Sequence, residues 1–149
     1  MTGPVELDET GMADLGARVA ATLRAGDVIG LSGDLGAGKT TLARAILAAL
    51  GLAGEAPSPT FAIVQPYDRP DVRLPVAHID LYRLNDPQDC RELGLEDYAD
   101  DGALLIEWPE RLPAGAWPEM LRLRLDGSGS TRRLTAIVPT AWEGRWPPR

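Results

Sequence analysis

The spacing of apolar residues predicts alternating strands and helices in the first half of the chain. Residues 12–23 carry apolar side chains every three to four positions and predict a helix, with Asp8 or Thr10 as its N-cap. Residues 27–31 form a short apolar run that predicts a buried strand, and residues 41–50 predict a second helix. A strand followed by a helix is the repeating unit of α/β folds.

The second half of the chain predicts mainly strands. Residues 60–65 and 76–81 are apolar runs separated by turn residues, and together they predict an antiparallel hairpin. Residues 103–106 are wholly apolar, as in a strand at the centre of a sheet. Leucines alternate with arginines over 121–125 and the chain returns over 134–138, which predicts a second hairpin with one solvated face.

These elements predict one domain over residues 1–140. A short strand over 5–7 precedes the first helix, and residues 85–101 are acidic and predict a short helix plus a loop. The hairpin that begins at residue 60 is expected to be inserted in an otherwise parallel α/β design. Residues 141–149, which include two consecutive prolines, are expected to form a poorly ordered tail.

Length and charge limit the function. A chain of 149 residues can bury one core but is too short for a nucleotide domain plus a separate catalytic domain. The net charge of -7 argues against a chain that grips nucleic acid by itself, so a partner protein is favoured as the large ligand. Cys90 is the single cysteine, which excludes a disulfide framework. With no signal peptide and no long apolar run, we expect a cytoplasmic protein without a membrane partner.

The most specific motif lies between the predicted strand at residues 27–31 and the predicted helix that follows it. Residues 33–41, Gly-Asp-Leu-Gly-Ala-Gly-Lys-Thr-Thr, match the phosphate-binding pattern G-x-x-x-x-G-K-[ST]. Its glycines allow a backbone in which successive amides point at phosphate oxygens, and the following helix adds its positive end. Lys39 is the only lysine in the chain and would reach the phosphates, while Thr40 would offer its hydroxyl to Mg²⁺. The expected nucleotide-binding residues are Gly33, Asp34, Leu35, Gly36, Ala37, Gly38, Lys39, Thr40 and Thr41.

Two acidic residues end apolar strands. Asp80 fits the role of a Walker B acid, with a strand-end turn residue as the alternative. Glu107 follows the run 103–106, and parallel strand ends gather at the ligand edge of such sheets. Glu107 is therefore a candidate for coordinating Mg²⁺ or for orienting the attacking water. With Lys39, these two acids are the candidate catalytic residues, and with Thr40 they are the candidate metal ligands.

Three further features have two interpretations each. Trp108 follows Glu107 and is either core filler or an exposed anchor for a partner. Residues 57–60, Pro-Ser-Pro-Thr, are either a switch segment that senses the terminal phosphate or a turn fixed by proline. His78 lies within a predicted strand, which is typical of a satisfied structural residue, and its spacing assigns it no catalytic role.

Four motifs taken together resemble a known family. They are Gly33 to Thr41, Pro57-Ser-Pro-Thr-Phe61, His78-Ile-Asp-Leu-Tyr-Arg-Leu84 and Ile106-Glu-Trp-Pro109. In this order and spacing they resemble the TsaE family, also called YjeE, the bacterial ATPases of tRNA threonylcarbamoyladenosine synthesis. The resemblance covers about residues 5–140.

The resemblance implies a fold and an activity. The fold would be a three-layer P-loop sheet, mostly parallel with antiparallel strands at the edges. The activity would be a Mg²⁺-dependent ATPase, weak alone, that binds TsaB and TsaD and sustains repeated rounds of modification at tRNA adenosine 37. The chain would not transfer the threonylcarbamoyl group itself, and it would meet tRNA only through the complex.

The resemblance also implies roles for single residues. By position, Thr40 and Glu107 would hold Mg²⁺, Asp80 would be the Walker B acid and Trp108 would belong to the partner-facing functional region. Glu9 and Thr10 lie near the start of the first helix, where the family has its base pocket. Thr60, in the segment that is either a switch or a turn fixed by proline, and Trp108 complete the expected nucleotide-binding residues.

Three other functions would use the same phosphate loop. A small P-loop metabolite kinase would need an acceptor pocket and an arginine-bearing lid, and no compact arginine-rich insertion separates the core strands. A non-hydrolysing ATP-sensing module would use the same residues as an ATPase, so the sequence leaves it open. A GTPase of the common class needs Asn-Lys-x-Asp, but the only lysine is in the phosphate loop.

Overall fold

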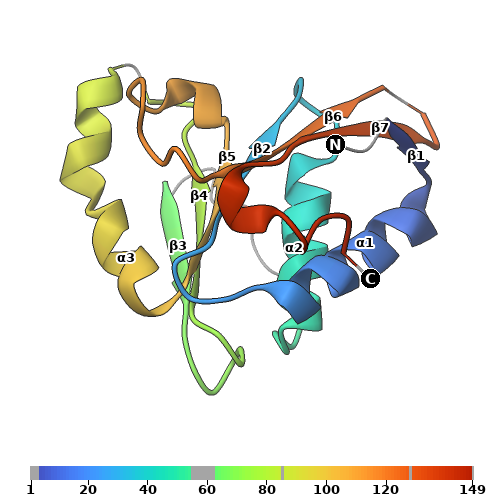
Figure 1. The fold of residues 1–149 in the computed structure, drawn as a ribbon, viewed down its shortest axis with the longest axis horizontal. Helices are drawn as coiled ribbons and strands as arrows, with labels where there is room; N and C mark the ends of the chain where they lie inside the picture. The colour runs from blue at the N-terminus through green and yellow to red at the C-terminus, as the bar shows by residue number, and fades with distance from the viewer. Residues whose placement is uncertain (1–3, 55–62, 85, 128, 149) are drawn as a thin grey trace.

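The computed structural model describes residues 4–54, 63–84, 86–127 and 129–148, and within them a seven-stranded sheet lies between two layers of helices (Figure 1). Helices α1 and α2 cover one face of this sheet, and α3 lies on the other side. The predicted three-layer α/β class is confirmed. The elements are β1 (Val5–Leu7), α1 (Glu9–Thr22), β2 (Val28–Ser32), α2 (Lys39–Ala49), β3 (Val64–Tyr67), β4 (Val76–Asp80), the 3-10 helix η1 (Pro87–Leu93), α3 (Leu95–Asp101), β5 (Ala103–Glu107), η2 (Pro109–Arg111), β6 (Leu121–Asp126), β7 (Arg132–Ile137) and η3 (Thr140–Trp142).

The sheet is parallel in its centre and antiparallel at both edges. The strand order is β1-β7-β6-β2-β5-β4-β3, with β6, β2, β5 and β4 mutually parallel. The predicted hairpins are β3–β4 and β6–β7, and β1 pairs with β7 antiparallel at the other edge. Strand β3 begins at Val64, and the earlier positions expected for it, 60–62, lie outside the described residues. Strands β2 and β5 are buried at every position, because helices cover both faces of the central sheet.

The register of the central strands determines which polar side chains meet. Strand β5 pairs in parallel with β2 on one side and with β4 on the other. In that register Glu107 is the partner of Leu31 in β2 and of Asp80 in β4. The carboxyl ends of three strands, and the loop that follows β2, therefore meet at one edge of the sheet.

Helix α1 packs closely on α2, the helix that follows this loop. A Cβ on Gly16 would lie 2.5 Å from the Cβ of Ala45, so the two helices approach more closely than a larger residue would permit. Asp8 caps α1, as predicted, by accepting a hydrogen bond from the Gly11 amide at 2.7 Å. Among the described residues, none of the helices has the length and apolar content required to cross a membrane.

The segment after β7 packs against the domain, contrary to the expectation of a poorly ordered tail. Trp142 is only 1% exposed and belongs to the core beneath α1 and α2. Arg145 donates to both carboxylate oxygens of Asp27, at 2.8 and 2.9 Å, and lies over the Trp142 ring at 4.0 Å. The expectation was wrong because these partners lie more than a hundred residues apart in the sequence and leave no local signal.

We expect Arg145→Ala to lower the free energy of unfolding by about 2–4 kcal/mol, because it leaves the Asp27 carboxylate nearly buried without its cation. The matched control is Arg18→Ala, which breaks an exposed pair with Asp14 and should cost less than about 1 kcal/mol. Urea unfolding followed by circular dichroism measures both. Equal midpoints for the two variants would show that the tail adds little to the domain.

Candidate functional site

The phosphate loop takes its shape from glycine conformations. Gly33, Gly36 and Gly38 all have positive φ, at 140°, 80° and 107°. A Cβ on Gly33 would lie 2.3 Å from the carbonyl oxygen of Leu125 in β6, so only glycine lets the loop leave β2 at this point. Gly38 is the N-cap of α2 and has no side chain to bind the amides of the first turn. These amides are therefore not taken up by a side-chain cap, and the positive end of α2 faces the loop.

Lys39 begins α2, and its side chain folds back over the loop. Its Nζ donates to the carbonyl oxygens of Gly33 at 2.6 Å and Asp34 at 2.7 Å, and it lies 4.5 Å from the centre of the Trp108 ring. The residue is only 4% exposed. Burial lowers the pKa of Lys39, and the charges of Glu107 and Asp80 act in the opposite direction. Burial removes the water that would stabilise the Lys39 ammonium. A bound anion would compensate for this lost hydration.

Glu107 lies between a hydroxyl and an imidazole. Its two carboxylate oxygens accept hydrogen bonds from Thr40 Oγ1, at 2.8 and 3.0 Å. Its Oε2 also lies 2.7 Å from Nε2 of His78, which is fully buried in β4. Nδ1 of His78 has no hydrogen-bond partner among the described residues, so Glu107 is the only polar contact that orients the ring there. His78 thus supports a site residue and is more than a satisfied residue of the core.

Asp80 ends β4 opposite Glu107 and is half-buried. Its Oδ1 accepts a hydrogen bond from the Tyr82 amide at 2.9 Å. Asp80 therefore also stabilises the turn at the end of its strand, which was the alternative role predicted for it. Burial raises the pKa of Asp80, the Tyr82 amide lowers it, and the neighbouring Glu107 raises it further. Two carboxylates so close together favour a bound cation.

Trp108 forms one wall of the site. It adopts a left-handed conformation with φ 63°, which is uncommon for a residue other than glycine. Its ring lies over Lys39 on one side and contacts Tyr82 on another, with ring centres 5.0 Å apart. The residue is half-buried and packs against the hydrophobic cluster that contains Ile79 and Ile106, so it is partly core and partly accessible at the site.

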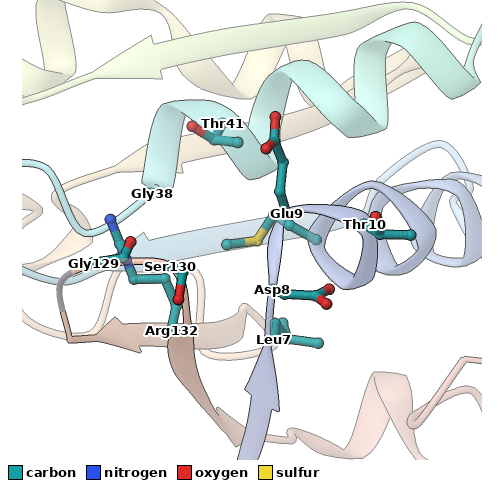
Figure 2. A pocket seen from close by; sticks show the side chains of 10 residues that line it. Leu7, Asp8, Glu9, Thr10, Gly38, Thr41, Gly129, Ser130 and Arg132 are labelled. Carbon is teal, nitrogen blue, oxygen red and sulfur yellow. The ribbon is translucent and has the colours of Figure 1, made fainter.

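Two cavities adjoin the loop. The first, of about 430 Å³, is lined by the ends of β4 and β5. The second, of about 450 Å³, lies at the start of α1 and is shown in Figure 2. Three residues line both cavities, so the two are neighbours along the loop: Gly38, Thr41 and Arg132. Figure 2 shows Glu9 of α1 and Thr41 of α2 facing the same space.

Comparison with known proteins identifies the family. The family model described as "Threonylcarbamoyl adenosine biosynthesis protein TsaE" matches residues 7–134. The chain belongs to the TsaE family. The tRNA threonylcarbamoyladenosine biosynthesis protein TsaE of Streptomyces coelicolor is 41% identical over 91% of this chain and 93% of its own length. The protein of the same name from Bacillus subtilis is 37% identical over 76% of this chain and 70% of its own.

A solved structure extends this similarity to the fold. The crystal structure of YdiB from Bacillus subtilis superposes with a TM-score of 0.72 at 28% identity. The match covers 97% of this chain and 92% of that one. Most of the tail after β7 therefore lies in the part of this chain that matches the YdiB structure.

The structure brings most of the predicted site residues of this TsaE family member together. Six of the nine loop residues, together with Asp80, Glu107 and Trp108, line the first cavity, and Glu9 and Thr10 line the second. Thr60 and the segment 57–60 lie outside the described residues. Two contacts were not predicted from the sequence, those of His78 with Glu107 and of Arg132 with the loop. His78 precedes Asp80 by two positions in one strand, which places both on the same face and was an available signal.

The donors in the first cavity suit Mg²⁺. They are oxygens only, from the Thr40 hydroxyl and the carboxylates of Glu107 and Asp80. Across the described part of the chain, no three histidine, cysteine or acidic side chains group as a metal site. The protein therefore offers few ligands of its own, which is the usual arrangement when phosphate oxygens and waters complete the Mg²⁺ shell.

We expect Asp80→Asn to stabilise the protein at pH 7 in the absence of nucleotide and metal. The raised pKa means that the folded state binds the Asp80 proton more tightly than the unfolded state, so the ionised form costs folding free energy above that pKa. The gain should be below about 1 kcal/mol because Asp80 is partly exposed. It should shrink as the pH falls through the raised pKa toward the ordinary aspartate value of 3.8.

Thermal melts at pH 7 and pH 5 in EDTA measure this effect. The control is Asp34→Asn, because Asp34 is an exposed carboxylate in the same loop and should leave the melting temperature unchanged. A destabilised Asp80→Asn variant at pH 7 would contradict the prediction.

Proposed function

We propose that this protein is a Mg²⁺-dependent ATPase that supports the synthesis of threonylcarbamoyladenosine in tRNA, acting with TsaB and TsaD. One observation carries the proposal: a phosphate loop whose Thr40 hydroxyl is hydrogen-bonded to a buried acid, Glu107, with Asp80 paired beside it. The names of the TsaE relatives support the biological role. The net charge of -7 supports contact with tRNA through the partners, and we place this role in the cytoplasm.

The two cavities support a place for each end of the nucleotide. The phosphates would bind along residues 33–41, where the glycine-rich loop, Lys39 and the start of α2 combine. The base would enter the second cavity, beside Glu9 and Thr10. Gly38, Thr41 and Arg132 line both cavities, so one extended ligand can span them.

Each residue of the first cavity has a role in this proposal. Lys39 would exchange the loop carbonyls for phosphate oxygens and neutralise their charge. Thr40 and Glu107 would hold Mg²⁺, which when bound stabilises negative charge on the phosphates. Asp80 would be the Walker B acid that assists Thr40 and Glu107 in holding Mg²⁺. His78 would keep the Glu107 carboxylate in place.

Exposed apolar residues at the site support dependence on a partner. Leu35, in the phosphate loop, is 68% exposed, and Tyr82 beside Trp108 is also exposed. A partner that covered them would exclude water from the first cavity and strengthen its electrostatics. The chain alone would then hydrolyse ATP slowly.

We expect Lys39→Ala to bind ATP at least about 10-fold more weakly while remaining folded, because a charge-assisted contact to phosphate is lost. Isothermal titration calorimetry measures the affinity, and a thermal melt checks the fold. A collapsed protein without ligand would contradict the view that Lys39 serves the ligand and not the core.

ATP turnover by the purified chain, alone and with TsaB and TsaD, tests the proposed function, with tRNA modification followed in parallel. We expect the partners to stimulate turnover, and the stimulated turnover to sustain modification. Glu107→Gln should retain ATP binding and lose about 100-fold or more of the stimulated rate, because a metal ligand is weakened.

The same experiment separates hydrolysis from sensing. A Glu107→Gln variant that binds ATP and still sustains full modification would indicate a non-hydrolysing ATP sensor. Tight ATP binding by the wild-type chain, with no turnover and no complex, would contradict the proposed function.

A further inference from the structure

Arg132 connects the last hairpin of the sheet to the phosphate loop. It is the first residue of β7 and pairs with Leu7 of β1, immediately before the start of α1. It lines both cavities, and Figure 2 shows its side chain beside Gly38, Gly129 and Ser130. A side chain in this position borders both cavities of the proposed nucleotide site.

The guanidinium of Arg132 binds carbonyl oxygens of the loop. Its Nε donates to Ala37 O at 3.0 Å, and one terminal nitrogen donates to Gly36 O at 3.2 Å. The other terminal nitrogen donates to the carbonyls of Gly129 and Thr131 in its own hairpin, at 2.7 and 3.0 Å. All four acceptors are main-chain oxygens, so the side chain fixes backbone and not another side chain.

Binding these carbonyls fixes the amides that follow them. In a planar trans peptide the C=O of one residue and the N–H of the next point in opposite directions. The contact with Ala37 O therefore directs the amide of Gly38 away from Arg132, and the contact with Gly36 O orients the amide of Ala37, which donates to Asp34 O at 3.0 Å. Arg132 thus sets both peptide units that lead from the turn at 34–37 into α2.

The loop needs such a contact because of its composition. Gly36 and Gly38 flank Ala37, and both have conformations that are readily exchanged for others. Lys39 binds the carbonyls of Gly33 and Asp34 but would leave them for a phosphate. The Arg132 contacts are with Gly36 and Ala37, so they do not compete with the movement of Lys39 from the carbonyls to a phosphate.

We propose that Arg132 is a positioning residue for nucleotide binding: its guanidinium fork holds the carbonyls of Gly36 and Ala37, which pre-orders the loop and orients the amide of Gly38 for phosphate. The inference rests on the proposed ATP-binding function. A lysine has the charge but not the planar fork, so it cannot replace the two parallel contacts.

The test uses ATP affinity measured by calorimetry with Mg²⁺ for the wild type, Arg132→Met, Arg132→Lys and Arg133→Met. Both Arg132 variants should bind ATP about 10-fold more weakly, because the free loop is then less ordered and ordering it reduces the free energy of binding. The control residue Arg133 is the next in β7, is largely exposed and forms an exposed ion pair with Glu6 at 3.5 Å, away from the loop, so its variant should bind within about 2-fold of wild type.

Two further readouts distinguish positioning from a general structural role. Amide exchange in the nucleotide-free protein should accelerate at residues 36–38 in both Arg132 variants, while exchange in β7 and the melting temperature stay near wild type. At saturating ATP, the turnover rate with TsaB and TsaD should be nearly unchanged, since the loss is in KM and not in kcat.

Several outcomes would overturn the inference. Wild-type affinity in Arg132→Lys would show that charge alone matters, and wild-type affinity in Arg132→Met would show that the contact does not matter. A large drop in melting temperature for both variants would assign Arg132 to stability alone. If the wild-type chain itself bound no ATP, the proposed function would fail, and the inference with it.

Discussion

A buried carboxylate at the end of β5 is the constraint on which the site depends. Glu107 is 2% exposed, and a carboxylate in that environment needs partners for its charge and its lone pairs. Thr40 and His78 provide them from α2 and β4. Both can do so only because β5 runs parallel to β2 and β4, which brings the start of α2 and the end of β4 to the same strand end. The sheet register and the chemistry of the site therefore have one cause.

The site concentrates groups that would be unfavourable elsewhere. A nearly buried lysine, two neighbouring acids and a tryptophan with positive φ lie within one cavity. Each costs stability in the free protein, because its charge is poorly hydrated or its backbone is strained. A ligand with several negative oxygens and a divalent cation would relieve all of them together. This coincidence of costs at one place is typical of a functional site.

Local patterns predicted the parts of the fold that have local causes. The apolar runs identified β2 and β5, and the glycine spacing identified the loop, because a buried parallel strand and a phosphate loop each require those residues in that order. Helix α2 begins at Lys39, two residues before the predicted start, because Gly38 can cap the helix in a left-handed conformation. Asp80 and Glu107 were predicted together because strand ends meet at one edge.

Other features depend on contacts between distant parts of the chain, and no local pattern shows them. The Trp142 and Arg145 side chains have partners in α1 and just before β2, so the tail looked disordered from its composition. Arg132 reaches residues 36 and 37 across 95 positions or more, and nothing in the alternating hairpin marks it apart from Arg133. The spacing of His78 and Asp80 places both on one face of β4, but the partner of His78, Glu107, lies 29 residues away and no local pattern shows that contact.

A crystal structure with Mg²⁺ and a non-hydrolysable ATP analogue tests most directly the claim that Glu107 and the phosphate loop form one nucleotide site. The phosphates should lie along residues 33–41 with Mg²⁺ bound by Thr40 and Glu107, His78 should still contact Glu107, and the base should lie beside Glu9 and Thr10 at the start of α1. A nucleotide bound elsewhere, or a Mg²⁺ ion that does not contact Glu107, would contradict it.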